Sequence, residues 1–265
     1  MLFRSGPRPA GSPANEKTRQ YLLEQLASYG LKPRIDEFKA PTPRGTVTFR
    51  NVIAELPGET PDRILLASHY DTKPYKEFRF VGANDGGSST GALLEIARIM
   101  AAEPHKRRLS YWFVFFDGEE AFCRDWGQCL NGKDNTYGSR HLVDLLKRNK
   151  ELARIKALVL LDMIGDRNLT LPYCEESSPW LVQALWETAH EAGYENYFLD
   201  RPQSMTDDHT AFLEAGVSAV DIIDFEYGDE PNENRYWHTK EDTLDKISTK
   251  SLKIVGDVVL LSLPR

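Results

Sequence analysis

The sequence predicts an α/β fold, namely a single-domain, three-layer α/β/α sandwich around a central mixed, mostly parallel, twisted sheet. Strand-like apolar runs alternate with helical patterns along the chain, which is typical of parallel strands whose connecting helices cover both faces of a sheet. Near the N-terminus two strand-like runs follow each other directly, which indicates an antiparallel pair and hence a mixed sheet. The chain has 265 residues and no linker-like segment, so we expect residues 1–265 to form one domain.

The N-terminal region is predicted to begin with a loop and a helix. Residues 6–15 are rich in proline and glycine, and Ser12 or Asn15 could cap a helix over residues 16–30 that ends at Gly30. Three strands are then expected, at residues 32–38, 46–56 and 63–68.

The rest of the chain alternates helices and strands. Gly86 and Gly87 open a helix that continues through residues 92–103, and residues 109–116 (LSYWFVFF) predict a central strand buried on both faces. Residues 121–137 are predicted to be a loop, and loops of this length are usually functional or disordered. After it we expect a helix at 138–148, a strand at 155–163, a helix at 179–192, a strand at 218–224 and a helix at 250–263.

Composition excludes several classes of partner and site. The net charge of -7 argues against nucleic acid as the main partner, because phosphate binding requires a basic face. No apolar run approaches the ~20 residues of a membrane helix, so no membrane span is expected. The three cysteines include no CxxC pair, which argues against a cysteine zinc site. Cys123 and Cys129 could form a disulfide, and the odd count leaves at least one free thiol.

The start of the chain leaves the compartment open. It reads MLFRSGPRPAGSP and contains no signal-like apolar stretch. This start could be the remnant of a trimmed leader, in which case the protein would be exported, either secreted or periplasmic.

Side chains that commonly bind zinc occur in five separate segments, most of them at the end of a strand-like run. Strand ends in an open α/β sheet converge on one crevice, which is where ligands bind. Histidine and carboxylate side chains gathered there form a zinc-type ligand set, so the sequence predicts a zinc enzyme. The segments are SHYD with His69 and Asp71, GANDGG with Asp85, FDGEE with Glu119 and Glu120, LLDMIGD with Asp162, and YWHT with His238.

Each of these residues also has an ordinary structural interpretation. A pair such as Glu119 and Glu120 is usually solvated, but here it follows the buried run at 109–116, where unpaired carboxylates are costly. Adjacent side chains point in different directions, so one can bind a metal while the other stays free as an acid or base. Asp85 alone would be a helix N-cap, and His238 alone a polar surface residue. The complete, ordered set favours the metal site.

The motifs HYD, GAND-GG, FDGEEAF, YGSRHL, LLDMIG, DDH and WHT, in this order, resemble the zinc aminopeptidase superfamily. More narrowly, they resemble its glutaminyl-peptide cyclotransferase (glutaminyl cyclase) branch. The resemblance extends from about Ala10 to about Leu261. It implies a zinc aminopeptidase-like fold and one zinc-dependent catalytic domain over residues 1–265.

The resemblance implies two alternative metal sites. The aminopeptidase form would hold two zinc ions bridged by Asp85, with His69 and Asp162 on one ion and Glu120 and His238 on the other. The cyclase form would hold a single zinc ion, bound by Asp85, Glu120 and His238. His69 and Asp162 would then support the site without binding zinc.

The resemblance also implies the catalytic and substrate-binding residues. Glu119 would be the general acid/base in either enzyme, and Asp162 and Asp207 would share protons with it in the cyclase. Trp126 and Trp237 would form walls of the cyclase substrate pocket, although core packing is their ordinary interpretation.

Several positions discriminate between the two branches. Asp207 stands where the aminopeptidases usually carry a serine, which favours the cyclase, as do Trp126 and Trp237. In the other direction, GANDGGSSTG is closer to the aminopeptidase form. Ser68 and Thr90 also occupy the places where animal cyclases often have a cysteine pair.

The predicted activity is therefore conversion of N-terminal glutamine in peptides or proteins to pyroglutamate, with release of ammonia. The alternative is a dizinc aminopeptidase that hydrolyses N-terminal residues from peptides. A third possibility is a non-catalytic binding domain with the same fold, which predicts the loss of a ligand or of the general base. Asp85, Glu119, Glu120 and His238 are all present, which argues against it.

Overall fold

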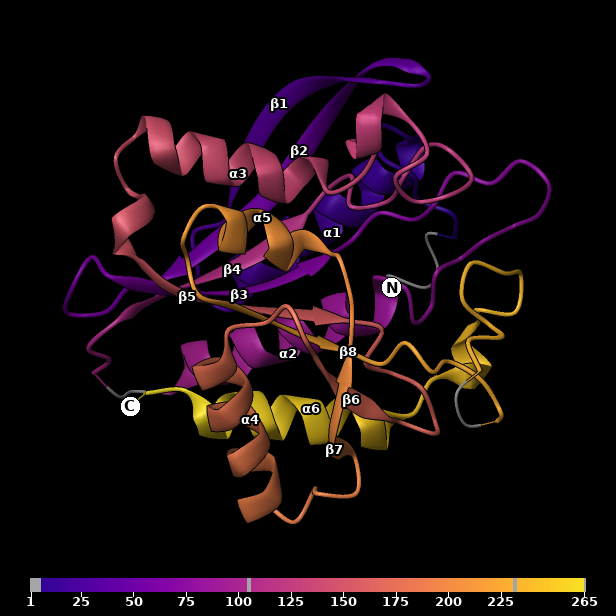
Figure 1. Ribbon diagram of the computed structural model, residues 1–265. Coiled ribbons are helices and arrows are strands. Elements are labelled where there is room, and N and C mark those ends of the chain that lie inside the picture. Colours follow the sequence, from indigo (N-terminus) through magenta and orange to yellow (C-terminus); the bar gives the residue numbers. More distant parts are fainter. Residues whose placement is uncertain (1–5, 104–105, 231–232, 265) are drawn as a thin grey trace.

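The structure, a computed structural model, describes residues 6–103, 106–230 and 233–264. Its central sheet contains β1 (Arg34–Thr42), β2 (Gly45–Leu56), β3 (Arg63–His69), β4 (Ser110–Phe116), β5 (Ile155–Asp162) and β8 (Ala219–Ile223). The strand order is β1-β2-β4-β3-β5-β8 (Figure 1). β2 pairs antiparallel with β1 and β4, whereas the pairs β3–β4, β3–β5 and β5–β8 are parallel. The predicted mixed, mostly parallel sheet is confirmed.

Helices cover both faces of this sheet (Figure 1). The core on one face includes residues of α1 (Pro13–Ser28), α2 (Gly87–Ala102), α4 (Pro179–Glu191) and α6 (Thr249–Ser262). The core on the opposite face includes residues of α3 (Tyr137–Arg148) and α5 (Asp208–Glu214). The result is the three-layer α/β/α sandwich that the sequence predicts.

Strand β4 shows why the central strands are continuous apolar runs. Successive side chains of a strand point to opposite faces of its sheet. Tyr111, Phe113 and Phe115 accordingly belong to the first core, and Trp112, Val114 and Phe116 belong to the second. Because helices cover both faces, no position of β4 faces water, and every one of its residues is buried.

All the helices and strands predicted from the sequence are present, with ends shifted by a few residues. Ser12 rather than Asn15 caps α1, since its hydroxyl accepts a hydrogen bond of 3.1 Å from the Asn15 amide. Within the described residues, two strands and one α-helix escaped prediction, as did the short 3-10 helices Leu130–Gly132, Leu152–Arg154 and Leu244–Lys246. β6 (Leu171–Cys174) and β7 (Phe198–Gln203) form a separate two-stranded parallel sheet, and α5 follows them. The sequence of β7, FLDRPQ, is polar and contains proline, and the 7 residues of α5 are too few for a clear period.

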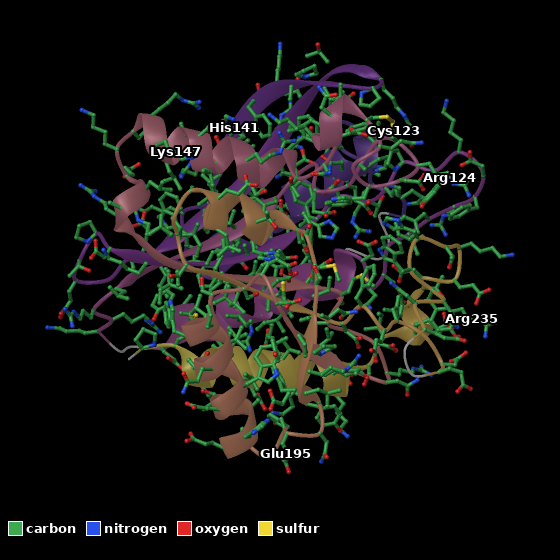
Figure 2. The ribbon with its side chains drawn as sticks, viewed as in Figure 1. Cys123, Arg124, His141, Lys147, Glu195 and Arg235 are labelled. Carbon is green, nitrogen blue, oxygen red and sulfur yellow. A yellow bond between two sulfur atoms is a disulfide. The ribbon has the colours of Figure 1, made fainter. Side chains whose placement is uncertain are left out.

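The predicted loop at residues 121–137 is closed by a disulfide between Cys123 and Cys129, a pairing that the sequence left open. Figure 2 shows Cys123 near the periphery of the molecule, with Arg124 close by. Cys174 is free and buried.

The carboxyl ends of β3, β4 and β5 meet at one edge of the sheet because these strands are parallel. β3 ends at His69, β5 ends at Asp162, and Glu119 and Glu120 follow shortly after β4. Three of the five predicted ligand segments therefore converge through strand topology alone.

None of the helices in the described ranges combines the length and apolarity that spanning a membrane requires. The start of the chain, where a leader remnant is expected, falls partly on residues 1–5, which lie outside the described residues.

Candidate active site

Asp85 lies between two groups of potential metal ligands. Its Oδ1 is 3.2 Å from Nε2 of His69, and its Oδ2 is 3.3 Å from Nε2 of His238. In each group, one ligand atom per residue lies within 4.8 Å of the others. We call His69, Asp85 and Asp162 the sheet-side group, and Asp85, Glu120 and His238 the cavity-side group. Asp85 thus belongs to both groups, as the resemblance implies for the aminopeptidase form.

The cavity-side group is arranged as if around a cation. Oε2 of Glu120 lies 3.2 Å from Nε2 of His238, close to Oδ2 of Asp85. Both carboxylate oxygens are buried, and neither forms a hydrogen bond within the described residues. Buried polar atoms without a partner are rare and costly, and a bound cation would satisfy both oxygens at once. Two carboxylates and one imidazole match the ligand types of zinc, so these residues fit the metal.

The sheet-side group is more enclosed. Nε2 of His69 lies 3.2 Å from Oδ1 of Asp162, and its Nδ1 lies 3.5 Å from Oδ1 of Asp71. Gly86 covers the His69 ring: its φ of +72° is in the left-handed region, and a Cβ there would lie 2.7 Å from Cε1 of His69. Because glycine has no Cβ, the backbone at Gly86 can lie this close to the imidazole. Burial lowers the pKa of His69, but Asp162 and Glu119 outweigh it and raise the pKa well above its usual value.

Two further buried carboxylates hold the ligand loops in place. Asp71 accepts hydrogen bonds from the backbone amides of Glu119 (3.2 Å) and Glu120 (3.4 Å). Asp242 accepts from the amides of Asn84 (2.7 Å) and Asp85 (3.1 Å). Asp242 is not among the residues predicted from the sequence, because nothing in the local pattern reveals a partner 158 positions away in the chain.

His238 is held by its own loop in an uncommon conformation. Its φ of +55° is left-handed, which is rare for a residue other than glycine and is often found at functional sites. The Trp237 ring stacks on the imidazole with centroids 3.9 Å apart. Burial lowers the pKa of His238, but Glu120 and Asp85 outweigh it and raise it to about 9.

Glu119 is a buried carboxylate outside both ligand groups. It is 6% exposed and lines a cavity of about 420 Å³, the inner cavity, together with the cavity-side group. Burial raises the pKa of Glu119 well above its usual value; His69 opposes this shift, and Asp207 and Glu120 reinforce it. A carboxyl group in this state suits proton transfer near neutral pH.

Asp207 also lines the inner cavity, as does Asp162. Asp207 caps α5, where its side chain accepts a hydrogen bond from the Asp208 amide. Burial, then Asp221 and Asp162, raise the pKa of Asp207 well above its usual value. Burial also raises the pKa of Asp162, against the opposing charge of His69.

Two further buried acidic residues, Asp208 and Asp221, are not among the site residues predicted from the sequence. Asp208 is fully buried, accepts a hydrogen bond from the Ser139 hydroxyl, and has its pKa raised by burial to about 7. Asp221 lies on β8, fully buried, and neither of its oxygens has a hydrogen-bond partner within the described residues. A carboxylate inside the buried run AVDII was the signal that could have identified Asp221.

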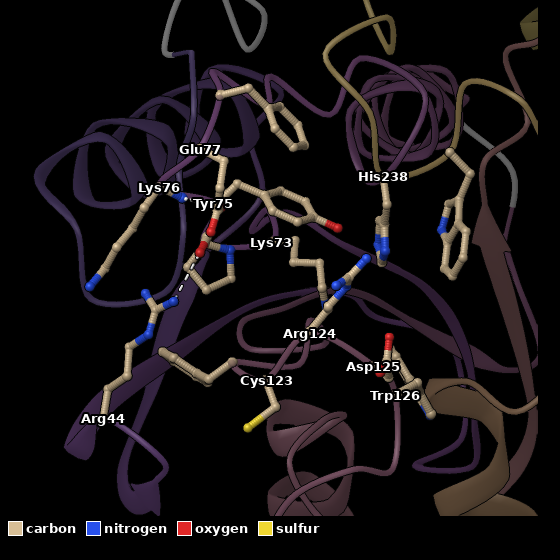
Figure 3. A pocket seen from close by; sticks show the side chains of 14 residues that line it. Arg44, Lys73, Tyr75, Lys76, Glu77, Cys123, Arg124, Asp125, Trp126 and His238 are labelled. Carbon is tan, nitrogen blue, oxygen red and sulfur yellow. Dashed lines mark hydrogen bonds between the residues drawn. The ribbon is translucent and has the colours of Figure 1, made fainter.

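The predicted tryptophans stand on the cavity wall. Trp126 and Trp237 line the inner cavity, and with His238 they also line a second cavity of about 770 Å³, which we call the outer cleft (Figure 3). Phe225 completes one side of the inner cavity and packs edge-on against Trp237 at 4.9 Å. The inner cavity thus has apolar walls around a cluster of carboxylates, and a substrate that enters it reaches the ligands and Glu119 together.

Comparison with known proteins agrees with this site. Residues 51–263 match the model of Peptidase family M28. The glutaminyl-peptide cyclotransferase of Gloydius blomhoffii is 31% identical over 293 residues, which cover 96% of this chain and 77% of the relative. These matches favour the cyclotransferase prediction over the aminopeptidase alternative.

Solved structures give the same result. The glutaminyl cyclase of an Acidobacteriales bacterium superposes with a TM-score of 0.90 at 38% identity, covering 98% of this chain and 90% of that one. A Zn-dependent exopeptidase from Parabacteroides distasonis has a TM-score of 0.84 at 27% identity, covering 98% and 92%. The family and this exopeptidase both suggest zinc. The chain belongs to Peptidase family M28 and, within it, to the glutaminyl cyclase branch.

Proposed function

We propose that this chain is a zinc-dependent glutaminyl-peptide cyclotransferase, which converts N-terminal glutamine of peptides and proteins to pyroglutamate and releases ammonia. The observation that carries the proposal is the position of Glu119. This buried carboxylate belongs to neither ligand group yet lines the same inner cavity as Asp85, Glu120 and His238. We propose that residues 1–265 form a single zinc-dependent catalytic domain that holds all of these residues.

The proposed metal content is one zinc ion per chain, held by Asp85, Glu120 and His238. The support is geometric: these three residues line the inner cavity, whereas His69 lies beneath Gly86 with its ring already facing Asp162 and Asp71. Zinc bound there would polarise the γ-carbonyl of glutamine as a Lewis acid.

Glu119 would move the protons of the reaction. As the α-amine attacks the γ-carbon, Glu119 accepts one amine proton, and a five-membered ring forms through the new N–C bond. The bond between the γ-carbon and the amide nitrogen then breaks, and Glu119 delivers the proton to the departing ammonia. The raised pKa of Glu119 suits a group that must both accept and return a proton.

The remaining groups support this step. Asp162 and Asp207 would share protons with Glu119. The charge of Asp207 raises the pKa of Glu119, and the charge of Asp162 raises the pKa of Asp207. Trp126 and Trp237 would exclude water, the competing nucleophile. Because the attack is intramolecular, holding the glutamine side chain folded supplies much of the rate.

One observation favours the aminopeptidase as a second candidate: the sheet-side group retains His69 and Asp162 around Asp85, as a second zinc ion would require. Purified, zinc-loaded protein incubated with a Gln-Phe peptide and a leucine anilide separates the two enzymes. Ammonia release without free amino acid supports cyclisation. Release of leucine, together with two tightly bound zinc ions found by elemental analysis, would exclude the cyclotransferase.

A further inference from the structure

The outer cleft lies next to the inner cavity and shares Trp126, Trp237 and His238 with it. If the proposed function holds, glutamine occupies the inner cavity of about 420 Å³, and the rest of the peptide can extend past the shared residues into the outer cleft. The outer cleft of about 770 Å³ is large enough for the residues that follow. Its chemistry therefore bears on which peptides are accepted.

The outer cleft carries cations that lack carboxylate partners. Arg44, Lys76 and Arg124 line it and are exposed, and none of the three forms an ion pair within the described residues. The guanidinium of Arg44 donates only to the Pro74 carbonyl, at 2.9 Å. Lys73 is different: its Nζ donates to the Ala121 carbonyl at 3.1 Å and lies 3.9 Å from Glu120, so it belongs to the interior.

Two carboxylates, Glu77 and Asp125, also line the cleft. Backbone hydrogen bonds and, less strongly, the charges of Lys76 and Arg124 lower the pKa of Glu77, although it forms no ion pair with either cation within the described residues. Glu77 accepts a hydrogen bond of 3.0 Å from the backbone amide of Lys76. With Lys73 left out, the lining has three basic side chains, Arg44, Lys76 and Arg124, and two acidic ones, Glu77 and Asp125. The cleft therefore has a small positive excess in a chain whose net charge is -7.

Arg124 is the cation best placed to contact substrate. Figure 3 shows it pointing into the cleft between Tyr75 and His238, whereas Arg44 and Lys76 lie farther from His238. It follows Cys123 directly, in a segment tied at both ends by the Cys123–Cys129 disulfide. The Cys123 amide also donates to the Asp134 carboxylate at 2.7 Å. A constrained loop loses less conformational freedom on binding, which strengthens the contact that its side chain makes.

We propose that the outer cleft binds the peptide segment that follows the N-terminal glutamine, and that Arg124 makes the enzyme prefer substrates with an acidic side chain there. An arginine guanidinium binds a carboxylate through two parallel hydrogen bonds, a geometry that lysine cannot provide. The proposal rests on the proposed function, since it assigns the glutamine to the inner cavity.

A carboxylate could also come from the C-terminus of a very short peptide. The cleft extends beyond Arg124 to Arg44 and Lys76, which gives room for chain to continue past the acidic residue. This favours an acidic side chain within a longer peptide.

The test compares ammonia release from four peptide amides: Gln-Glu-Ala-Phe, Gln-Ala-Glu-Phe, Gln-Lys-Ala-Phe and Gln-Ala-Lys-Phe. A fifth substrate, the free acid Gln-Ala, presents only a terminal carboxylate. We expect kcat/KM for the better glutamate peptide to exceed that of its lysine counterpart about tenfold, mostly through KM. The preference should shrink in 0.5 M NaCl, because charges at an exposed rim are screened.

Variants assign the preference to Arg124. Arg124→Glu should reverse the order of the glutamate and lysine peptides, with the change in kcat/KM carried mostly by KM. Lys133→Glu makes the same change of charge at an exposed position in the same loop that lines neither cavity, and it should keep the wild-type order.

The outcomes separate the two levels of inference. If no peptide releases ammonia from zinc-loaded protein, the proposed function fails, and this inference fails with it. If all four amides react with equal kcat/KM, or if Arg124→Glu and Lys133→Glu behave alike, the cyclase stands and the role of Arg124 is wrong. If Gln-Ala free acid alone shows the advantage, Arg124 recognises a terminal carboxylate, and the proposed acidic side-chain preference is rejected.

Discussion

The inner cavity and the outer cleft share a wall but differ in charge and burial. The inner cavity is lined by Glu119, Asp162 and Asp207, each no more than 6% exposed. The outer cleft is lined by exposed Arg44 and Arg124. Buried charges interact strongly and resist screening by salt, whereas exposed ones interact weakly and are screened. Changes in the inner cavity should therefore alter the chemical step, and changes in the outer cleft should alter substrate affinity.

The largest expected effect comes from removing the proton-transfer group. Glu119→Gln keeps the size of the side chain but cannot accept a proton, so kcat should fall about 10³-fold. Glu77→Gln makes the same chemical change in the outer cleft and should keep kcat within about twofold. Steady-state kinetics on one Gln peptide, with zinc content measured for both proteins, compares the two regions directly. Full activity of Glu119→Gln would mean that another residue is the base.

The next largest effect distinguishes the two ligand groups. His238→Ala should weaken zinc binding by more than about 100-fold, because loss of even a hydrogen-bonding partner of a ligand weakens binding by about 10- to 100-fold. His69→Ala should weaken it less, by about 10- to 100-fold, since His69 is proposed only to support the ligand Asp85, 3.2 Å away. Competition with a chelator, followed by elemental analysis, measures both. Equal losses of zinc in the two variants would contradict the single-ion site.

Asp208 should make stability depend on pH. Its pKa is about 7 in the folded chain and ordinarily 3.8, so between these values the folded chain holds a proton that the unfolded chain has released. The stability that this group contributes is present below about pH 3.8 and is lost as pH rises to about 7. Asp208→Asn removes this titration. The difference in free energy of unfolding between the variant and wild type should therefore shift in favour of the variant by roughly 2–4 kcal/mol between pH 4 and pH 7.5.

Urea unfolding of both proteins at several pH values tests this prediction. Asp144→Asn, on the exposed surface of α3, serves as the matched control. A constant difference between Asp208→Asn and wild type across the range would show that Asp208 does not hold the proton.

The smallest effect concerns the backbone that covers His69. Gly86→Ala should lower the free energy of unfolding by about 1–3 kcal/mol, because φ is +72° and the new Cβ would lie 2.7 Å from the imidazole. Gly91→Ala, in the same helix with no atom within 4 Å of the new Cβ, should raise it by about 0.5–1 kcal/mol. Chemical unfolding measures both changes. Opposite signs are expected, and equal signs would contradict the close approach of Gly86 to His69.

The sequence predicts the parts of this molecule that depend on local pattern. Apolar runs locate β3, β4 and β5, and parallel topology then brings His69, Glu120 and Asp162 to one edge. Asp85 and His238 could be added only through the family resemblance and the order of the motifs. Their roles as metal ligands stay predictions, as do those of Trp126 and Trp237 in substrate binding.

The parts that escaped prediction depend on contacts between distant segments. Asp242 holds the Asn84 amide across 158 positions, and no local pattern encodes such a bond. Asp221 interrupts an apolar strand, and the imidazole near it, Nδ1 of His209 at 3.7 Å from its Oδ2, comes from a different element, α5. The disulfide could not be decided either, because two cysteines six positions apart can pair or not according to the path of the loop.

The Cys123–Cys129 disulfide makes the enzyme sensitive to where the chain matures. Reducing compartments keep such thiols reduced. A chain made in a reducing cytosol would therefore lack the disulfide that closes the segment carrying Arg124 and Trp126. Preparations with different oxidation histories should then differ in kcat/KM, and the larger differences are expected on long peptides. Counting titratable thiols before each assay, one for the closed ring and three for the open one in unfolded protein, would identify which form is being measured.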